Sequence, residues 1–350
     1  MPCPSSAGVL LLLSFAWCHP QGAVAASHTY DVIVYGATPG GVAAAVAAAR
    51  EGSATALLEP GEYVGGAMSG GLGLADYGAH AQRVMGERSI STEFFKRVAS
   101  HYGVPFEWPR DGQCGGHNIP WVSEPHVAEG VMLGMLREAN VTILRLSRID
   151  ALQQAPGQRT SATPPRIATV STPDGRVFAA KVYVDGTYEG ALMKLAGVSY
   201  TFGREASATY NETGAGRLPT KAEKPVWPVG TRSAQLPSGI SPWEDDTNTT
   251  LIKGVWGGEV APVGGADGRV GGYDWRLTLT DNKSNWVPIP KPANYNPKDY
   301  ELVRRAIKKG FRAHAPGFAV PNRKTDWKMC TFTNQSLLTS NKLICVRASW

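Results

Sequence analysis

Near the start of the chain, two short apolar runs stand on either side of an alanine-rich segment. Residues 31–35 (DVIVY) and 54–58 (ATALL) have the length and composition of buried strands. The alanine-rich residues 42–50 between them predict a helix, which we expect to end near Gly52. A strand, a turn, a helix and a second strand within about 30 residues form the unit of a Rossmann half, so the pattern predicts a parallel α/β sheet.

The turn between the first strand and the helix reads GATPGG, and the glycines at its ends have physical roles. Gly36 permits a sharp turn off the strand, and Gly41 permits the helix to approach the sheet closely. The start of the helix offers free N–H groups and partial positive charge to a pyrophosphate. The alternative is a glycine-rich turn that serves packing only.

Glu59 follows the second strand, where its carboxylate can accept hydrogen bonds from both hydroxyls of a ribose. A 2′-phosphate would be repelled there, which disfavours NADP. Thr38 stands at the second glycine position of the usual motif; its side chain narrows the approach to the pyrophosphate, although its hydroxyl can donate to a phosphate oxygen. The residues expected at the dinucleotide are Gly36, Ala37, Thr38, Pro39, Gly40, Gly41 and Glu59.

A second glycine-rich stretch, residues 65–73, follows Glu59 closely and favours FAD over NAD. A backbone with so few side chains can pass against a large flat ring without a clash. Gly65 and Gly66 are therefore further expected contacts of the cofactor. The alternative is a glycine-rich surface loop.

Apolar periodicity predicts two helices after this loop. Residues 91–102 form one apolar face, with Ser91 as the N-cap and Gly103 as the stop. Residues 123–139 form another, with Ser123 as the N-cap. We expect both helices to lie in an insertion between the Rossmann half and the next strands.

The following segments predict a strand meander and a returning strand. The meander has three short strands, residues 141–146, 166–170 and 176–179. Asp174-Gly175 predicts a tight hairpin between the last two. Residues 182–187 (VYVDGT) read as an apolar strand with a small polar turn, and residues 188–196 as a helix stopped at Gly197. This layout is typical of glutathione-reductase-like flavoproteins.

Five segments between residues 30 and 327 carry a more specific resemblance: YDVIVYGATPGGVAAAVAAAREG, LLEPGEYVGGAMSGGLG, EPHVAEGVMLGMLREANVTIL, VYVDGTYEGALMKLAGVSYTFGRE and YDWRLTLTDNKSNWVPIPKPANYNPKDYELVRR. In these segments the chain resembles the FAD-dependent oxidoreductases known as xanthan lyase-like flavoproteins. The segment VDGTYEGAL is the most discriminating, because generic Rossmann proteins lack it. The resemblance implies FAD held by the glycines and acid above, with two further residues near the cofactor, Asp185 and Gly186.

The chain departs from that family pattern in two places. Ala191 stands where the family usually has an acidic residue, so we expect one polar contact to be lost. After Trp327 the resemblance fades, and the remaining residues lack the strand, turn and helix that return to the cofactor domain in related flavoproteins. We therefore expect a truncated or mis-spliced C-terminus. A chain truncated in this way would lack one wall of the FAD pocket and would hold FAD weakly or not at all.

Candidates for the chemistry itself are few. His126, in the first turn of the second helix, is a candidate proton donor near the flavin; the alternative is a surface histidine. Arg276 lies on the polar face of the alternating segment 273–280, where it can meet an anionic substrate or the reduced ring; the alternative is a solvated face. Cys114 is a candidate reactive thiol or covalent anchor of the flavin; the alternative is an ordinary loop cysteine.

The N-terminus predicts export. Residues 8–17 form an apolar run of the length of a signal-peptide core, and residues 23–25 (AVA) form a small-x-small cleavage pattern. We therefore expect residues 1–25 to be a signal peptide, the mature protein to be secreted, and no later segment to span a membrane. The N-x-S/T acceptors that fit a glycosylated protein are Asn140, Asn211, Asn248, Asn282 and Asn334.

Composition excludes several other classes. Hydrophobic residues make up 43% and charged residues 18%, which is a globular and not a disordered balance. The net charge of +6 is spread without a basic stripe, so we expect no nucleic-acid partner. The seven histidines are scattered and the cysteines are sparse, so we expect no metal site and no disulfide framework.

We thus expect an α/β fold with two domains. A Rossmann-like FAD-binding domain with a β-meander spans residues 26–200, with a helical insertion at about 74–140, and a mixed α+β substrate domain spans 201–327, followed by an atypical tail at 328–350. The expected activity is the two-electron oxidation of a small-molecule or carbohydrate-derived substrate, with O₂ as a candidate acceptor. The rivals are a lyase or hydrolase that uses a bound dinucleotide without net redox change, and a truncated, inactive nucleotide-fold protein.

Overall fold

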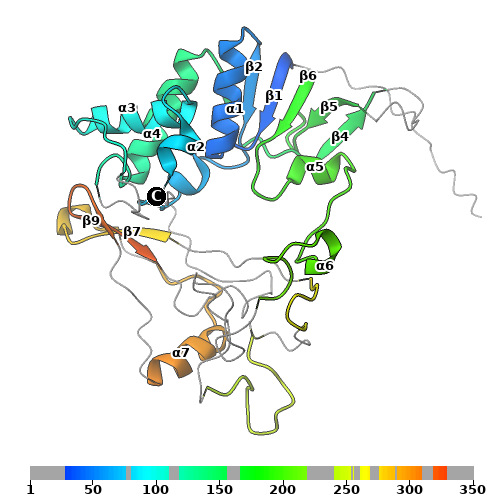
Figure 1. Cartoon of the computed structure of the whole chain (residues 1–350), viewed down its shortest axis with the longest axis vertical. Coiled ribbons are helices and arrows are strands. Elements are labelled where there is room, and N and C mark those ends of the chain that lie inside the picture. Colours follow the sequence, from blue (N-terminus) through cyan, green and yellow to red (C-terminus); the bar gives the residue numbers. More distant parts are fainter. Residues whose placement is uncertain are drawn as a thin grey trace, which may run out of the picture.

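The chain builds a six-stranded sheet with helices and a separate three-stranded sheet (Figure 1). The computed structural model describes residues 28–75, 80–109, 118–155, 166–218, 240–253, 255, 261–268, 276–287, 290–309 and 318–328. The expected signal peptide, Cys114 and the tail from residue 329 onward lie outside these described residues.

The large sheet has the strand order β3-β2-β1-β6-β5-β4. Its parallel part consists of β1 (His28–Tyr35), β2 (Thr55–Leu58), β3 (Thr142–Leu144) and β6 (Val177–Asp185). The antiparallel part consists of β4 (Ala151–Gln154) and β5 (Ile167–Ser171). In the register of the central strands, Val34 lies between Leu57 and Val184, so the carboxyl ends of β1, β2 and β6 meet at one edge.

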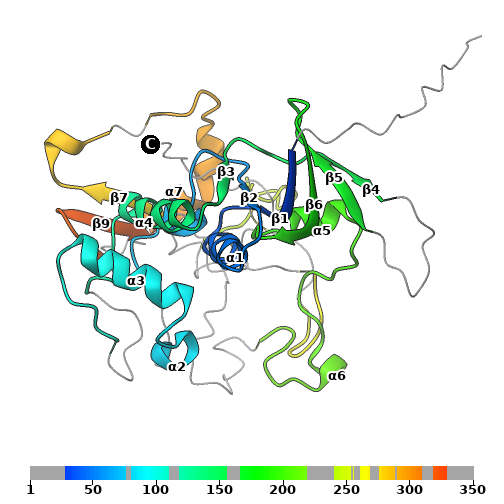
Figure 2. The same cartoon turned by 90° about the horizontal axis from the view of Figure 1, so that it is seen from above.

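Both faces of β1 are buried, as is expected for a parallel sheet covered on each side. On one face, Val34 packs in a core with the helices α1 (Pro39–Arg50), α3 (Ile90–His101) and α4 (Pro125–Glu138). On the other face, Ile33 packs in a second core with the meander strands and α5 (Ala191–Leu195). Seen from above, the three long helices gather on one side of β1 and the strands β5 and β4 fan out on the other (Figure 2). The predicted α/β fold with a Rossmann-like half is confirmed.

The predicted N-caps of the two insertion helices were wrong. Ser89 and not Ser91 caps α3, because its hydroxyl accepts the Thr92 N–H at 3.0 Å. Helix α4 starts one residue after Glu124, and Ser123 lies outside it. The stretch SIST offers several capping hydroxyls, so the sequence alone leaves the start of α3 open by two residues.

Three strand predictions also change. Residues 142–144 form β3, which pairs in parallel with β2 and does not belong to the meander, and β4 supplies the missing meander strand. Residues 177–185 form one strand, β6, and not two. Lys181 interrupts the apolar pattern in the middle of β6 because it forms an exposed ion pair with Asp31 on the neighbouring β1. Helix α5 is shorter than predicted and starts at Ala191.

The smaller sheet has the order β7-β9-β8, all antiparallel. Its strands are β7 (Arg276–Thr280), β8 (Phe318–Val320) and β9 (Lys324–Lys328). The remaining short elements are α2 (Ala81–Met85), α6 (Ser207–Tyr210), α7 (Glu301–Lys308) and the 3-10 turns η1 (Gly66–Met68), η3 (Lys283–Asn285) and η4 (Pro297–Tyr300). Among the described residues, no helix has the length and apolarity that a membrane span requires.

Candidate functional site

Two turns meet at the carboxyl ends of β1 and β6. We call residues 36–41 the glycine turn and residues 185–188 the second turn. A Cβ on Gly41 would lie 1.9 Å from the carbonyl oxygen of Gly36, and one on Gly186 would lie 2.8 Å from the same oxygen. Gly36 has a φ of +94°, and a Cβ there would lie 2.8 Å from a methyl group of Thr187. Only glycine fits these three positions, so the two backbones touch directly.

Thr38 holds the two turns together. It is the N-cap of α1, and its hydroxyl accepts the Gly41 N–H at 3.2 Å. The same hydroxyl donates to the carbonyl of Gly186 at 2.6 Å. The hydroxyl proton that we expected to reach a phosphate oxygen is therefore directed to Gly186, and the structure explains a threonine in place of a glycine by this bridge.

Glu59 folds back onto the glycine turn. Its Oε2 accepts the N–H of Ala37 at 2.7 Å, and its Oε1 accepts the N–H of Gly61 at 2.7 Å. Each carboxylate oxygen has a second lone pair, so the group can accept further hydrogen bonds. The acid at the end of β2 thus lies beside the N-terminal end of α1.

A third segment, residues 65–73, lies against both turns, and we call it the glycine loop. The N–H of Gly65 donates to the carbonyl of Ala37 at 2.7 Å, and the N–H of Ala67 donates to the hydroxyl of Tyr188 at 2.9 Å. Gly65 and Gly66 have φ values of +118° and +53°, so the loop depends on glycine for its path. The loop therefore joins the glycine turn and the second turn at one place.

The far end of the glycine loop contacts the smaller sheet. The N–H of Gly73 donates to the carboxylate of Asp326 in β9 at 3.1 Å, and Asp326 is fully buried. A Cβ on Gly73 would lie 2.7 Å from a methyl group of Val320 in β8. Gly73 and Asp326, which are 253 positions apart in the sequence, thus meet at the end of the glycine loop.

Asp185 shapes the second turn from within. Its carboxylate accepts the N–H and the hydroxyl of Thr187, at 2.9 and 2.7 Å, and the N–H of Met193 at 2.8 Å. These bonds tie the end of β6 to the start of α5. The expected contact between Asp185 and a cofactor stays a prediction.

The donor set fits the diphosphate end of a dinucleotide. Helix α1 has 12 residues, and its N-terminal turn carries partial positive charge. Gly40 in that turn is exposed, and a Cβ there would meet nothing closer than 3.8 Å, so the approach to the helix end is open. The carboxylate of Glu59 and the backbone of the glycine loop both lie next to this helix end.

A sequence model of FAD-dependent oxidoreductases matches residues 31–343 of the chain. The chain belongs to this family of FAD-dependent oxidoreductases. FAD is accordingly the cofactor, and the predicted membership of the FAD-dependent oxidoreductases is confirmed. The match runs past Trp327, the residue after which we expected the resemblance to fade.

Three solved structures illustrate the likeness of this FAD-dependent oxidoreductase to known proteins. THI4 of Thermovibrio ammonificans is 17% identical with a TM-score of 0.34, over 53% of this chain and 71% of that one. L-proline dehydrogenase of P. horikoshii is 16% identical with a TM-score of 0.36, over 51% of this chain and 59% of that one. The 3-ketosteroid-Δ4-(5α)-dehydrogenase of Rhodococcus jostii RHA1 is 16% identical with a TM-score of 0.32, over 46% of each chain. No curated protein matches the chain in sequence.

The two candidate catalytic residues of the oxidoreductase, His126 and Arg276, lie far from the glycine turn and the second turn in sequence. His126 is exposed in the first turn of α4. Arg276 is the first residue of β7, opposite Lys328, and its side chain lies outside the described residues. No described hydrogen bond joins His126 to the glycine turn, and the roles of both residues stay predictions. Among the described residues, no His, Cys, Asp or Glu cluster is arranged to hold a metal ion.

Sequence reasoning missed a buried charge beside the oxidoreductase's glycine loop. Glu124, only 2% exposed, accepts hydrogen bonds from the hydroxyl of Tyr102 at 3.0 Å, from Asn322 Nδ2 at 2.7 Å and from the ammonium of Lys324. Burial raises the pKa of Glu124, but the bonds from Lys324, Asn322 and Tyr102 outweigh it, so the pKa lies below its ordinary value. Burial raises the pKa of Tyr102.

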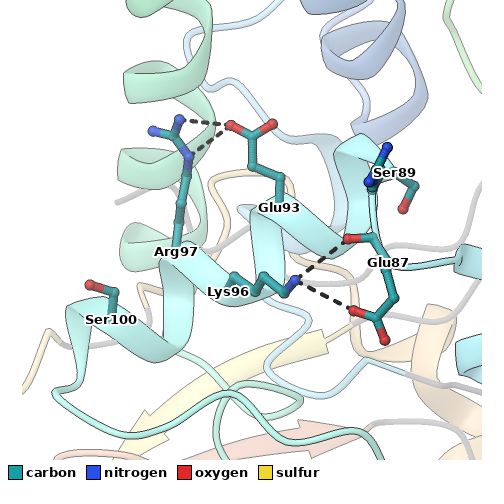
Figure 3. Close-up of a pocket in the computed structure, with 7 residues that line it drawn as sticks. Glu87, Ser89, Glu93, Lys96, Arg97 and Ser100 are labelled. Carbon is teal, nitrogen blue, oxygen red and sulfur yellow. Dashed lines mark hydrogen bonds and ion pairs between the residues drawn. The ribbon is translucent and has the colours of Figure 1, made fainter.

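A charged surface pocket of about 410 Å³ lies along α3, outside the site of the turns (Figure 3). It is lined by Glu87, Arg88, Ser89, Glu93, Lys96, Arg97 and Ser100. Four of its charged side chains form ion pairs: Lys96 with Glu87 at 3.5 Å, and Arg97 with Glu93 at 2.7 Å. The hydrogen bond from Arg50 and then those from Arg97 lower the pKa of Glu93 to about 2, against the effect of its burial. These ion pairs leave little charge for a ligand.

Proposed function

We propose that the chain is a secreted oxidoreductase that holds FAD across the glycine turn. In this proposal it oxidises a small-molecule or carbohydrate-derived substrate by two electrons. The observation that carries it is the hydrogen bond between Ala37 N and Glu59 Oε2 at 2.7 Å. That bond brings a carboxylate, a bare glycine backbone and the N-terminus of α1 together, which is the set that binds an adenosine diphosphate moiety.

Each part of the site has a role in the proposal. The N-terminal turn of α1 binds the pyrophosphate through its dipole and the backbone N–H of Gly40, because Pro39 has no N–H and that of Gly41 is bonded to Thr38. Glu59 accepts hydrogen bonds from the ribose, and the peptides of Gly65 and Gly66 give the ring system a surface without side chains. When bound, FAD supplies the capacity to accept two electrons, and the protein supplies position and electrostatics.

An absorption spectrum of the purified full chain tests the cofactor site. We expect flavin bands in the wild type and their loss in Glu59→Ala. Glu62→Ala is the matched control, because Glu62 is an exposed acid three residues after Glu59 and its loss should leave the flavin bands unchanged. Far-UV circular dichroism of each variant separates loss of FAD from loss of fold. A Glu59→Ala protein that folds and keeps its full flavin content would contradict the proposed site.

The secretion part of the proposal rests on residues 8–17 and 23–25 of the sequence. We expect the N-terminal peptide of the exported protein to begin at Ala26. Mass spectrometry of that peptide is the measurement. An exported protein that still carries Met1 would argue against cleavage at this place.

Substrate turnover is tested by its need for an acceptor. With O₂ as the acceptor, each two-electron oxidation consumes one O₂ and yields one H₂O₂. Turnover of sugars or sugar acids with matched oxygen uptake supports the proposal. Product formed without any electron acceptor would favour a lyase or hydrolase, and a folded protein that never takes up FAD would favour an inactive nucleotide-fold protein.

A further inference from the structure

Tyr188 joins the second turn to the glycine loop through its side chain. Its hydroxyl accepts the N–H of Ala67 at 2.9 Å, over a sequence separation of 121 residues. A Cβ on Gly66 would lie 2.4 Å from the same hydroxyl oxygen. The phenol therefore rests directly on the bare backbone of Gly66.

Described hydrogen bonds hold the glycine loop at both of its ends and in its middle, and the bond in the middle, to Tyr188, differs from those at the ends. At one end, Gly65 donates to the carbonyl of Ala37, a residue with no exposed surface. At the other end, Gly73 donates to the fully buried Asp326. Tyr188 holds the middle, and it is 60% exposed. A hydrogen bond made by an exposed side chain contributes little to the stability of the whole fold, yet it restrains the backbone that it contacts.

We propose that Tyr188 is a positioning residue for FAD, which it serves by fixing the backbone of Gly65–Ala67 against the second turn. The inference rests on the proposed function, in which this backbone faces the cofactor. A run of glycines loses much conformational entropy when it becomes ordered. A side chain that orders the loop before binding lowers that cost, so the bound state gains affinity without a new contact to the ligand.

The variant Tyr188→Phe removes only the hydroxyl and keeps the ring on Gly66. We expect it to weaken the binding of FAD to the full-length apoprotein by about two- to tenfold, the effect of one lost hydrogen bond. Titration with FAD, followed by the quenching of flavin fluorescence, gives the dissociation constant. Tyr210→Phe is the control, because Tyr210 is also exposed, at 73%, and lies in α6.

Two further readouts separate positioning from a role in the fold. In Tyr188→Phe apoprotein, the amide of Ala67 should exchange with deuterium faster than in the wild type, while the peptides of α1 exchange as before. The midpoint of thermal unfolding of the apoprotein should stay within about 1 °C of the wild type, because the lost bond is exposed.

A second pair of variants tests the contact from the other side. Gly66→Ala adds a methyl group against the hydroxyl of Tyr188 and should also weaken FAD binding. In the double variant Gly66→Ala, Tyr188→Ala the methyl group has room, although alanine stays strained at the φ of +53°, so Gly66→Ala should weaken FAD binding less in the Tyr188→Ala background than in the wild type. Such non-additivity is expected only when the two residues act on one another.

The outcomes are distinguishable. If the wild type takes up FAD and Tyr188→Phe binds it as tightly with unchanged exchange at Ala67, the role of Tyr188 is refuted and the proposed cofactor site stands. If Tyr188→Phe lowers the unfolding midpoint by several degrees, the residue belongs to the fold and not to positioning. If the wild-type chain binds no FAD, the proposed function fails, and the inference fails with it.

Discussion

The carboxylate of Glu124 and the ammonium of Lys324 form a buried ion pair between residues 200 positions apart. The side chains are 2% and 16% exposed. Glu124 stands at the N-cap of α4 and Lys324 is the first residue of β9. The pair therefore ties the helical insertion to the smaller sheet, close to the end of the glycine loop.

Breaking this pair from one side should be costly. We expect Lys324→Ala to lower the free energy of unfolding by about 3–5 kcal/mol, because it leaves a buried carboxylate without its cation. Lys181→Ala is the matched control: that lysine is 79% exposed in its ion pair with Asp31, so its loss should lower the free energy of unfolding far less. Urea unfolding of both variants is the measurement, and equal losses would argue that the Glu124 pair is not buried in solution.

The same pair makes stability depend on pH. The pKa of Glu124 in the fold lies below its ordinary value of 4.5, since the bonds from Lys324, Asn322 and Tyr102 outweigh burial. Its contribution is thus complete above pH 4.5 and is lost as the pH falls through the lower pKa of the folded state. We expect the wild type to lose more unfolding free energy than Glu124→Gln on acidification from pH 6 into this range. Parallel curves for the two proteins would contradict the linkage.

Two neighbouring glycines of the glycine turn, Gly40 and Gly41, should differ sharply in how well they tolerate substitution by alanine. Gly41→Ala would put a methyl group 1.9 Å from the carbonyl oxygen of Gly36, so we expect a protein that fails to fold or to bind FAD. Gly40→Ala, one residue earlier, meets nothing closer than 3.8 Å and should be neutral or stabilise α1 by up to about 1 kcal/mol. Soluble yield and thermal unfolding compare the two, and similar behaviour would mean that the turns do not touch as described.

Thr38 should be replaceable by serine and not by valine. Thr38→Val keeps the volume but removes the cap of α1 and the bond to Gly186, so we expect a loss of about 1–2 kcal/mol in apoprotein stability. Thr38→Ser keeps both bonds and should restore most of that loss. Equal stability of the valine and serine variants would show that the hydroxyl does not bridge the two turns.

Much of the cofactor half could be predicted because its signals are local. The strand, glycine turn and helix of residues 31–50 depend on neighbours in the sequence, and the structure has them as β1 and α1. The hairpin at Asp174-Gly175 likewise formed as expected, with Gly175 at a φ of +86°. Glu59 was predicted from its distance to the glycine turn, and the structure brings it to Ala37.

The rest depends on partners far away in the chain. Strand β4 (ALQQ) has no apolar alternation, because it lies at the edge of the sheet and only β5 pairs with it. Glu124 reads as an ordinary acid at a helix start, and only residues 322–324 reveal why it is buried. Tyr188 reads as a helix residue, whereas its contact with the glycine loop arises from the sheet order that sets β6 beside β1.

The bond between Gly73 and Asp326 has a consequence for biosynthesis. The two residues are 253 positions apart, so at about 5–20 residues per second the ribosome needs roughly 12 to 50 seconds to make the second after the first. During that interval the nascent Rossmann half can form its strands and α1. The N–H of Gly73 in the glycine loop still lacks its acceptor, the carboxylate of Asp326. The bond that joins the glycine loop to the smaller sheet can therefore form only after translation of β9, well after synthesis of the N-terminal half.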